Sequence, residues 1–204
     1  MLNYLLNNLY IIPICRLMFM LLYVLGGEDI IWFRKKHYAI DDKAGETLVK
    51  ELNKFTRLRD YKVLGRTTLR FGETEYTYDA IMLTYYGTIV FTAAPQGGEI
   101  YGDTSDDSWV MIYEGKRRPF RNPMLNMNGS EKFFREMYRA ENVKFGKTDM
   151  FVVFPNKDAS VAVTSKNGNV CKVDRMSGIL EKKYFADNGA DIDAMEAAIK
   201  KYTV

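Results

Sequence analysis

The apolar residues of this 204-residue chain follow two different patterns. Residues 9–25 are almost wholly apolar and are interrupted only by Pro13 and Arg16. From residue 40 onwards, apolar residues recur at the spacings of amphipathic helices and strands. We therefore divide the chain into a hydrophobic N-terminal helix (residues 1–27), a basic linker (28–39) and a globular domain (40–204).

The domain is organised around two short apolar, β-branched runs, residues 78–84 and 88–93. Tyr85, Tyr86 and Gly87 separate them, which predicts a β-hairpin with Gly87 supplying the turn. An acidic residue, Asp79, opens the first strand. A polar residue at the mouth of an apolar strand is typical of a functional site, and an aspartate that only caps a turn is the alternative.

Further helices and strands surround this hairpin. Residues 40–55 predict a helix because Leu48, Leu52 and Phe55 share one face. Residues 61–64, 67–71, 109–113, 149–155, 161–164 and 170–173 predict strands, while 131–138 and the segment from 191 onwards predict helices. Asn167 and Gly168 form a turn signal between the last two strands. Together these elements predict an α/β fold with a mixed central sheet and flanking helices.

Composition excludes several classes of protein. The net charge of +3 is too small to indicate nucleic-acid binding by itself. Cys15 and Cys171 lie in very different contexts, so we expect no disulfide framework and a reducing compartment. The single histidine, His37, excludes a histidine-rich metal site and leaves no spare base for a catalytic triad.

The apolar segment 9–25 is close to the length of a membrane span. About 17 helical residues rise ~26 Å, against a hydrocarbon core of ~30 Å. Arg16 offsets much of the favourable insertion energy, so the balance is narrow. Arg34, Lys35 and Lys36 follow the segment, and the positive-inside rule places them in the cytoplasm. We predict a membrane anchor with a cytoplasmic domain, and the alternative is a helix packed on that domain or lying at an interface.

An ordered series of short motifs resembles the nuclease-related domain (NERD), a branch of the PD-(D/E)xK nuclease fold. The series spans roughly residues 36–201 and contains Gly45-Glu46, residues 78–81, Gly87, residues 98–102, Trp109, Asn122-Pro123, an amide at Asn126 and the strand 149–154. In that fold an aspartate on one strand and a Glu-x-Lys motif on the next meet at a divalent cation. The resemblance implies that Asp79 is the first acid and that Glu46 is an auxiliary acid near the metal. Taken alone, Glu46 is an ordinary first-turn glutamate favoured by the helix dipole.

The chain differs from the family at the Glu-x-Lys motif. Counted from Gly87 and Gly98, the Glu-x-Lys positions fall on Thr92 and Ala94, which supply neither a carboxylate nor a charge. The resemblance then implies a degenerate site in which Asp79 and Glu46 are vestigial and hold Mg²⁺ weakly or not at all. No small-molecule cofactor is indicated, and the loss of a metal ligand together with a charged group favours a protein without nuclease activity over an active enzyme.

Two functions fit these observations. The first is a membrane-anchored binding module for nucleic acid or protein, with Lys116, Arg117, Arg118, Arg121, Asn122 and Asn126 as candidate nucleic-acid contacts. A solvated hairpin tip explains the same basic group. The second is an active Mg²⁺-dependent nuclease with relocated residues, either Glu99 or the pair Glu114 and Lys116. The position of Gly115 favours a hairpin turn at Glu114-Gly115-Lys116 over a displaced motif.

Overall fold

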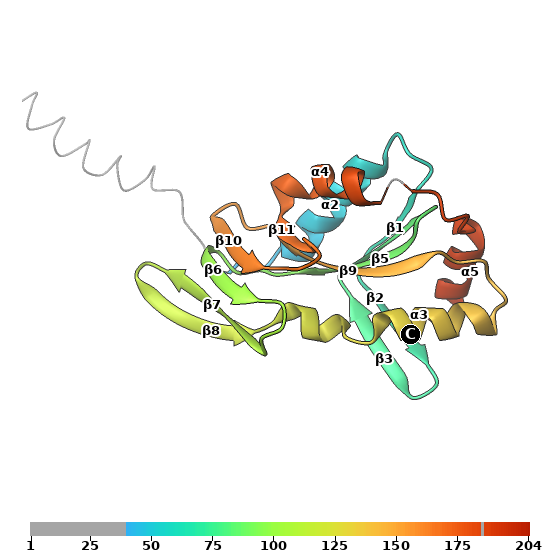
Figure 1. The fold of residues 1–204 in the computed structure, drawn as a ribbon, viewed down its shortest axis with the longest axis horizontal. Coiled ribbons are helices and arrows are strands. Elements are labelled where there is room, and N and C mark those ends of the chain that lie inside the picture. Colours follow the sequence, from blue (N-terminus) through green and yellow to red (C-terminus); the bar gives the residue numbers. More distant parts are fainter. Residues whose placement is uncertain (1–39, 185) are drawn as a thin grey trace, which may run out of the picture. The chain divides into compact units, whose positions relative to one another are not determined.

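A five-stranded mixed sheet forms the middle layer of the domain in the computed structural model, which describes residues 40–184 and 186–204 (Figure 1). Its strands, in spatial order, are β1 (Lys62–Leu64), β4 (Ala80–Thr84), β5 (Gly87–Ala93), β9 (Lys147–Phe154) and β11 (Val170–Lys172). The strand β4 runs antiparallel to both β1 and β5, while β9 runs parallel to both β5 and β11.

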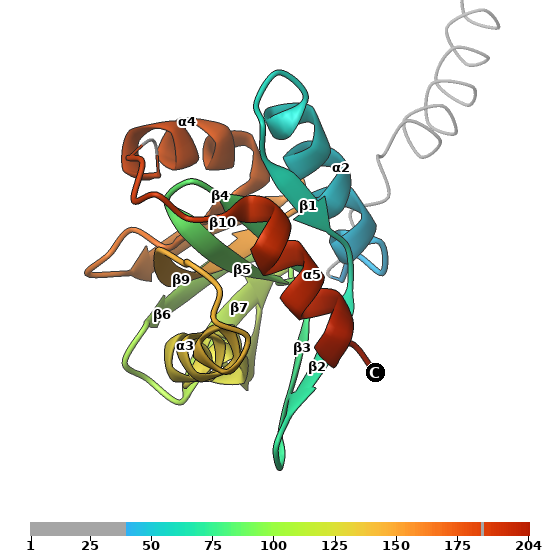
Figure 2. The same cartoon turned by 90° about the vertical axis from the view of Figure 1, so that its right-hand side faces the viewer.

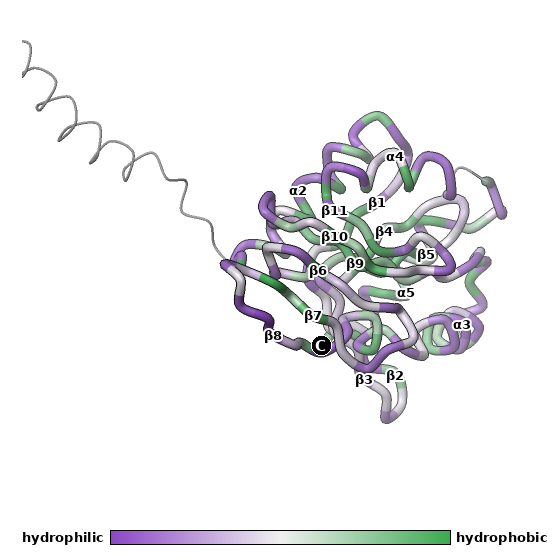
Figure 3. The backbone as a smooth tube through the Cα atoms, turned by 60° about the vertical axis from the view of Figure 1, so that its left-hand side comes forward, coloured by the Kyte–Doolittle hydropathy of each residue, from purple (hydrophilic) through white to green (hydrophobic). Residues whose placement is uncertain are grey.

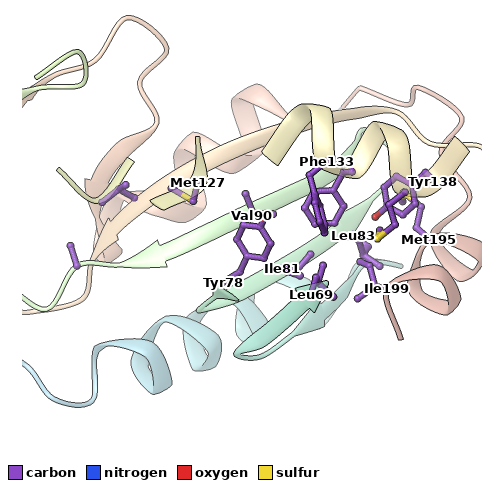
Figure 4. Packing of buried hydrophobic residues seen from close by; sticks show 14 of the residues in the cluster. Leu69, Tyr78, Ile81, Leu83, Val90, Met127, Phe133, Tyr138, Met195 and Ile199 are labelled. Carbon is purple, nitrogen blue, oxygen red and sulfur yellow. The ribbon is translucent and has the colours of Figure 1, made fainter. Parts of the chain in front are cut away.

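Two pairs of helices cover the two faces of this sheet (Figure 2). One pair is α2 (Ala44–Thr56) and α4 (Val173–Lys183), and the other is α3 (Ser130–Ala140) and α5 (Ile192–Tyr202). All five residues of β4 are buried, because alternate side chains point to opposite helical layers. Ala80 and Met82 pack with α2 and α4, whereas Ile81 and Leu83 pack with α3 and α5 (Figure 4).

A second sheet has four strands in the order β10 (Ala159–Thr164), β6 (Gly98–Asp103), β7 (Ser108–Tyr113) and β8 (Lys116–Arg121). One face of it joins the core through Ile100, Trp109 and Met111, which are all buried. The edge strand β8 is hydrophilic beside the more hydrophobic β7 (Figure 3). The short 3₁₀ helix η1 (Pro123–Met127) leads from β8 into α3.

A third, two-stranded ribbon contains β2 (Thr67–Phe71) and β3 (Thr74–Tyr78) and projects from the domain (Figures 1 and 2). Leu69 and Tyr78 anchor the ribbon in the core, where both are fully buried. The ribbon also pairs with the end of the chain through a bridge between Leu69 and Thr203.

Most of the predicted elements are confirmed. The central hairpin forms between β4 and β5, with Leu83 opposite Thr88 and Thr84 opposite Gly87. Gly87 is required because its φ is +140° and a Cβ there would lie 2.6 Å from the Lys147 nitrogen. The closing helix α5 begins after Asp191, whose carboxylate accepts the Ala194 N–H at 3.0 Å. The mixed α/β class with flanking helices is therefore correct.

Several details of the prediction were wrong. The strands form three sheets, not one. The expected strand 78–84 is broken at Asp79, because Tyr78 pairs with Thr67 in the ribbon while Ala80 pairs with Phe91. The Asn167-Gly168 turn does not join a hairpin, since β10 and β11 belong to different sheets. The strand β3 and the helix α4 were not expected.

The predicted anchor at residues 9–25 lies outside the described residues. Within the described part of the chain, no helix is both long enough and apolar enough to cross a membrane.

Candidate functional site

Asp79 sits at the bend between β3 and β4, where the chain passes from the ribbon into the central sheet. Its backbone N–H donates to the Phe91 carbonyl at 3.0 Å. Its carboxylate oxygen Oδ2 accepts the Ala93 N–H at 2.9 Å. Asp79 is therefore hydrogen-bonded to Phe91 and Ala93, the residues on either side of Thr92. These bonds hold its half-buried carboxylate at the end of β5.

A cavity of about 980 Å³ opens beside this carboxylate. The start of α2, Asp79 and the end of β5 line it together. Gly45 faces Asp79 so closely that a Cβ there would lie 4.0 Å from Oδ1. Glu46, the next residue, lines the same cavity with an exposed side chain. The structure thus brings the two predicted acids, Asp79 and Glu46, to one site.

Cations border the same cavity along the exposed side of α2. Lys50 and Arg57 follow Glu46 at helical spacing, and Arg66 reaches the cavity from the start of the ribbon. None of these three side chains has a hydrogen bond or ion pair with another described residue. The sequence contains the signal for Lys50 and Arg57, because they fall on the polar face opposite the buried Leu48 and Leu52, but the prediction did not use it.

The two positions that correspond to Glu-x-Lys do not line the cavity. Ala93 and Pro95 line it instead. Ala94 is 1% exposed and belongs to the hydrophobic cluster that contains Trp109 and Phe154. Thr92 is half-buried, and strand alternation points it to the same face as Ala94.

This arrangement offers few ligands for a cation. Mg²⁺ is often held by one or two carboxylates together with water and phosphate oxygens, so the predicted acids Asp79 and Glu46 would suffice to hold it, and Asp41 and Asp42 line the same cavity. Among the residues that the structure describes, no group of three or more histidine, cysteine, aspartate or glutamate side chains is placed to bind a metal.

The predicted basic group lies on β8, away from this cavity. Lys116, Arg117, Arg118 and Arg121 are all exposed, and none of them lines the cavity beside Asp79. Glu114 and Gly115 form the expected turn, with φ values of +50° and +71°. The pair Glu114 and Lys116 is therefore part of a hairpin tip.

The remaining predicted residues are also outside the cavity. Glu99 is exposed on β6 and accepts the Tyr101 hydroxyl at 2.8 Å. Asn122 is fully buried, where its amide donates to the carbonyls of Thr104 and Asp106 and its oxygen accepts the Met124 N–H. The polar atoms of Asn122 are thus used within the protein. Asn126 is exposed on η1.

The geometry defines an α/β domain in which carboxylates and cations line one cavity where α2 meets the end of β5. The family model of the nuclease-related domain, NERD, matches residues 41–155, which is more than half of the chain. The chain therefore belongs to the NERD family. No curated protein and no solved structure matches it.

Proposed function

We propose that this NERD domain binds nucleic acid without cleaving it. The observation that supports this proposal is the environment of Ala94. At the position where the family carries a catalytic lysine, this chain has a buried alanine in the hydrophobic cluster. No cation can act on a phosphate from that position.

The energetic argument concerns catalysis only. Losing one preorganised group that stabilises charge costs about 10²–10³ in rate, or roughly 2.7–4 kcal/mol. Thr92 and Ala94 remove a metal ligand and a charged group together. Binding of nucleic acid does not need the two motif residues, because cations can contact phosphates without them. Such cations line the cavity at Lys50, Arg57 and Arg66.

A cleavage assay tests the proposal. A chain that begins at Glu28 keeps every described residue of both buried clusters. With Mg²⁺ or Mn²⁺ we expect it to cut single- and double-stranded DNA and RNA no faster than the matched Asp79→Ala variant does. The same preparation should bind these nucleic acids in an electrophoretic mobility-shift assay.

The alternative is an active nuclease with relocated residues. Cleavage by the unmodified domain that disappears in Asp79→Ala would establish this alternative and overturn the proposal. The variants Glu99→Gln and Glu114→Gln would then identify the substitute acid. We favour the non-cleaving function because neither glutamate lines the cavity that holds Asp79.

We also propose that residues 9–25 anchor the domain to a membrane, with the domain in the cytoplasm. The apolar run and the following basic cluster, residues 34–36, support this proposal. The full chain should stay in the membrane pellet after alkaline carbonate extraction, whereas the chain from Glu28 should not. Complete release of the full chain by carbonate would instead favour a helix packed on the domain.

A further inference from the structure

The second sheet has one buried face and one exposed face. Ile100 and Trp109 are fully buried on the inner face. On the other face Tyr101 is 44% exposed, and Ala162 and Pro119 are also exposed. We call this second surface the outer face. No described helix or strand covers these residues.

An apolar row crosses all four strands of the outer face. Strand register places Ala162 beside Tyr101, Tyr101 beside Val110, and Val110 beside Pro119. Ile112 lies two residues further along β7, on the same face as Val110. The outer face therefore carries a continuous apolar strip with the exposed ring of Tyr101 in it.

The cations of β8 flank this strip along one edge of the sheet. Arg117 and Arg121 alternate with Pro119 along β8, so they share its face. Lys116 and Arg118 on the same edge strand are exposed as well. Within residues 40–184 and 186–204, the side chains of these four cations make no hydrogen bond or ion pair. Cations on an edge strand can serve only to prevent aggregation. That explanation accounts for the four cations of β8 but not for the exposed Tyr101 two strands away.

We propose that the outer face binds single-stranded nucleic acid, with phosphates along β8 and a base stacked on Tyr101. This proposal rests on the proposed nucleic-acid binding and assigns it to a surface and a substrate class. Two strand spacings, ~10 Å, separate β8 from β6, which is comparable to the reach of a nucleotide from its phosphate to the far edge of its base. An exposed aromatic ring beside a cationic track is the arrangement that binds unpaired bases.

The shape of the surface favours single strands over the alternatives. The bases of a duplex are already stacked on one another, so a duplex would use the cations of β8 but not the ring of Tyr101. A lipid surface would be met by apolar side chains surrounded by cations, whereas the four cations of β8 lie along one edge of the sheet. Glu99 accepts a hydrogen bond from the Tyr101 hydroxyl on this face. Its negative charge would repel a phosphate at Tyr101, so the phosphates are expected along β8 instead.

Fluorescence anisotropy with labelled oligothymidine and oligouridine tests the proposal. The competitors are a duplex of equal length and vesicles that contain phosphatidylserine. The chain from Glu28 should bind the single strands more tightly than the duplex. Tyr101→Ala should weaken single-strand binding roughly 5- to 150-fold, the loss typical of one stacked base, and should leave duplex binding unchanged.

The chain contains a matched control at Tyr85. Its ring is 38% exposed and its hydroxyl donates to Asp60, as that of Tyr101 donates to Glu99, but it lies on the turn between β4 and β5. Tyr85→Ala should therefore leave binding unchanged. Glu99→Gln should tighten single-strand binding because it removes a negative charge and keeps the hydrogen-bond acceptor.

Salt dependence supplies an independent readout. Arg117→Gln combined with Arg121→Gln should lower the slope of log K against log salt by about 1.4, at ~0.7 for each lost phosphate contact on a single strand. Equal losses in Tyr101→Ala and Tyr85→Ala, or an unchanged slope, would overturn the assignment to the outer face. Duplex binding that is stronger than single-strand binding, or binding to vesicles alone, would also overturn it. The duplex result would leave the proposed function intact, whereas binding to no nucleic acid would remove both.

Discussion

Replacing Asp79 tests whether its carboxylate stabilises the fold through a hydrogen bond or only holds a cation. Its carboxylate accepts the Ala93 N–H, and within the described part of the chain this N–H at the end of β5 would otherwise have no acceptor. Asp79→Ala removes that acceptor, whereas Asp79→Asn keeps an oxygen at nearly the same position. We expect the alanine variant to lose stability and the asparagine variant to retain most of it.

The structure sets the size of the effect. A hydrogen bond to a charged group contributes about 1.5–3 kcal/mol, and a neutral one about 0.5–1.5 kcal/mol. Because Asp79 is half-buried, water can replace part of the lost bond. We therefore expect Asp79→Ala to lower the free energy of unfolding by about 1.5–2.5 kcal/mol, and Asp79→Asn by less than about 1 kcal/mol.

Urea denaturation of the chain from Glu28 measures both values, provided that the slope m is the same for all variants. Glu46→Ala is the matched control, because this exposed side chain lines the same cavity but makes no hydrogen bond with another described residue, and we expect a change within about 0.5 kcal/mol. A site that only holds a cation predicts the opposite sign for Asp79→Ala, since removing one of two neighbouring carboxylates relieves repulsion. Stabilisation by Asp79→Ala, or equal losses in both Asp79 variants, would refute the reasoning.

Two further predictions concern packing and pH. Gly102→Ala should destabilise the domain by about 1–3 kcal/mol in the same urea assay, because a Cβ there would overlap the Trp109 indole. Gly178→Ala lies in the middle of α4, where a Cβ meets no other atom, and should instead stabilise the domain by about 0.4–1 kcal/mol. A Gly102→Ala variant that is more stable than Gly178→Ala would contradict the close packing of Gly102 against Trp109. Hydrogen bonds from Lys200 and Lys62 lower the pKa of Glu196, so its stabilising effect is present above its unfolded pKa and is lost as pH falls through the folded value. The difference in unfolding free energy between Glu196→Gln and the unmodified chain should therefore shrink as pH falls below about 4.5, and a constant difference would refute this assignment.

The predictions from sequence were most accurate where one local pattern decides the structure. The hairpin of β4 and β5 follows from two β-branched runs around Gly87, and the N-cap of α5 follows from Asp191. The family resemblance located Asp79 and Glu46, and the structure places both on one cavity.

The predictions were least accurate where partners lie far apart along the chain. Nothing local to Tyr78 shows that it pairs backwards with Thr67, while its neighbour Ala80 pairs forwards with Phe91. The division into three sheets depends on parallel pairs such as β6 with β10, whose residues are about 60 positions apart. The apolar row across the outer face exists only because of those pairings.

The burial of Ala94 shows why the packing of the core disfavours a lysine at this position. A lysine placed there would have to bring its ammonium group out of a cluster in which Ala94 is 1% exposed. Full burial lowers the pKa of a lysine by up to 3–5 units, so a lysine held in this cluster should cost up to about 3–5 kcal/mol at pH 7. Because the folded pKa is lowered, the cost should fall as pH rises toward about 10. Ala94→Met, which adds similar bulk without charge, should show a pH-independent loss. A stable Ala94→Lys variant at pH 7 would show that the ammonium group can leave the cluster, and would remove the structural argument against a cation at this position.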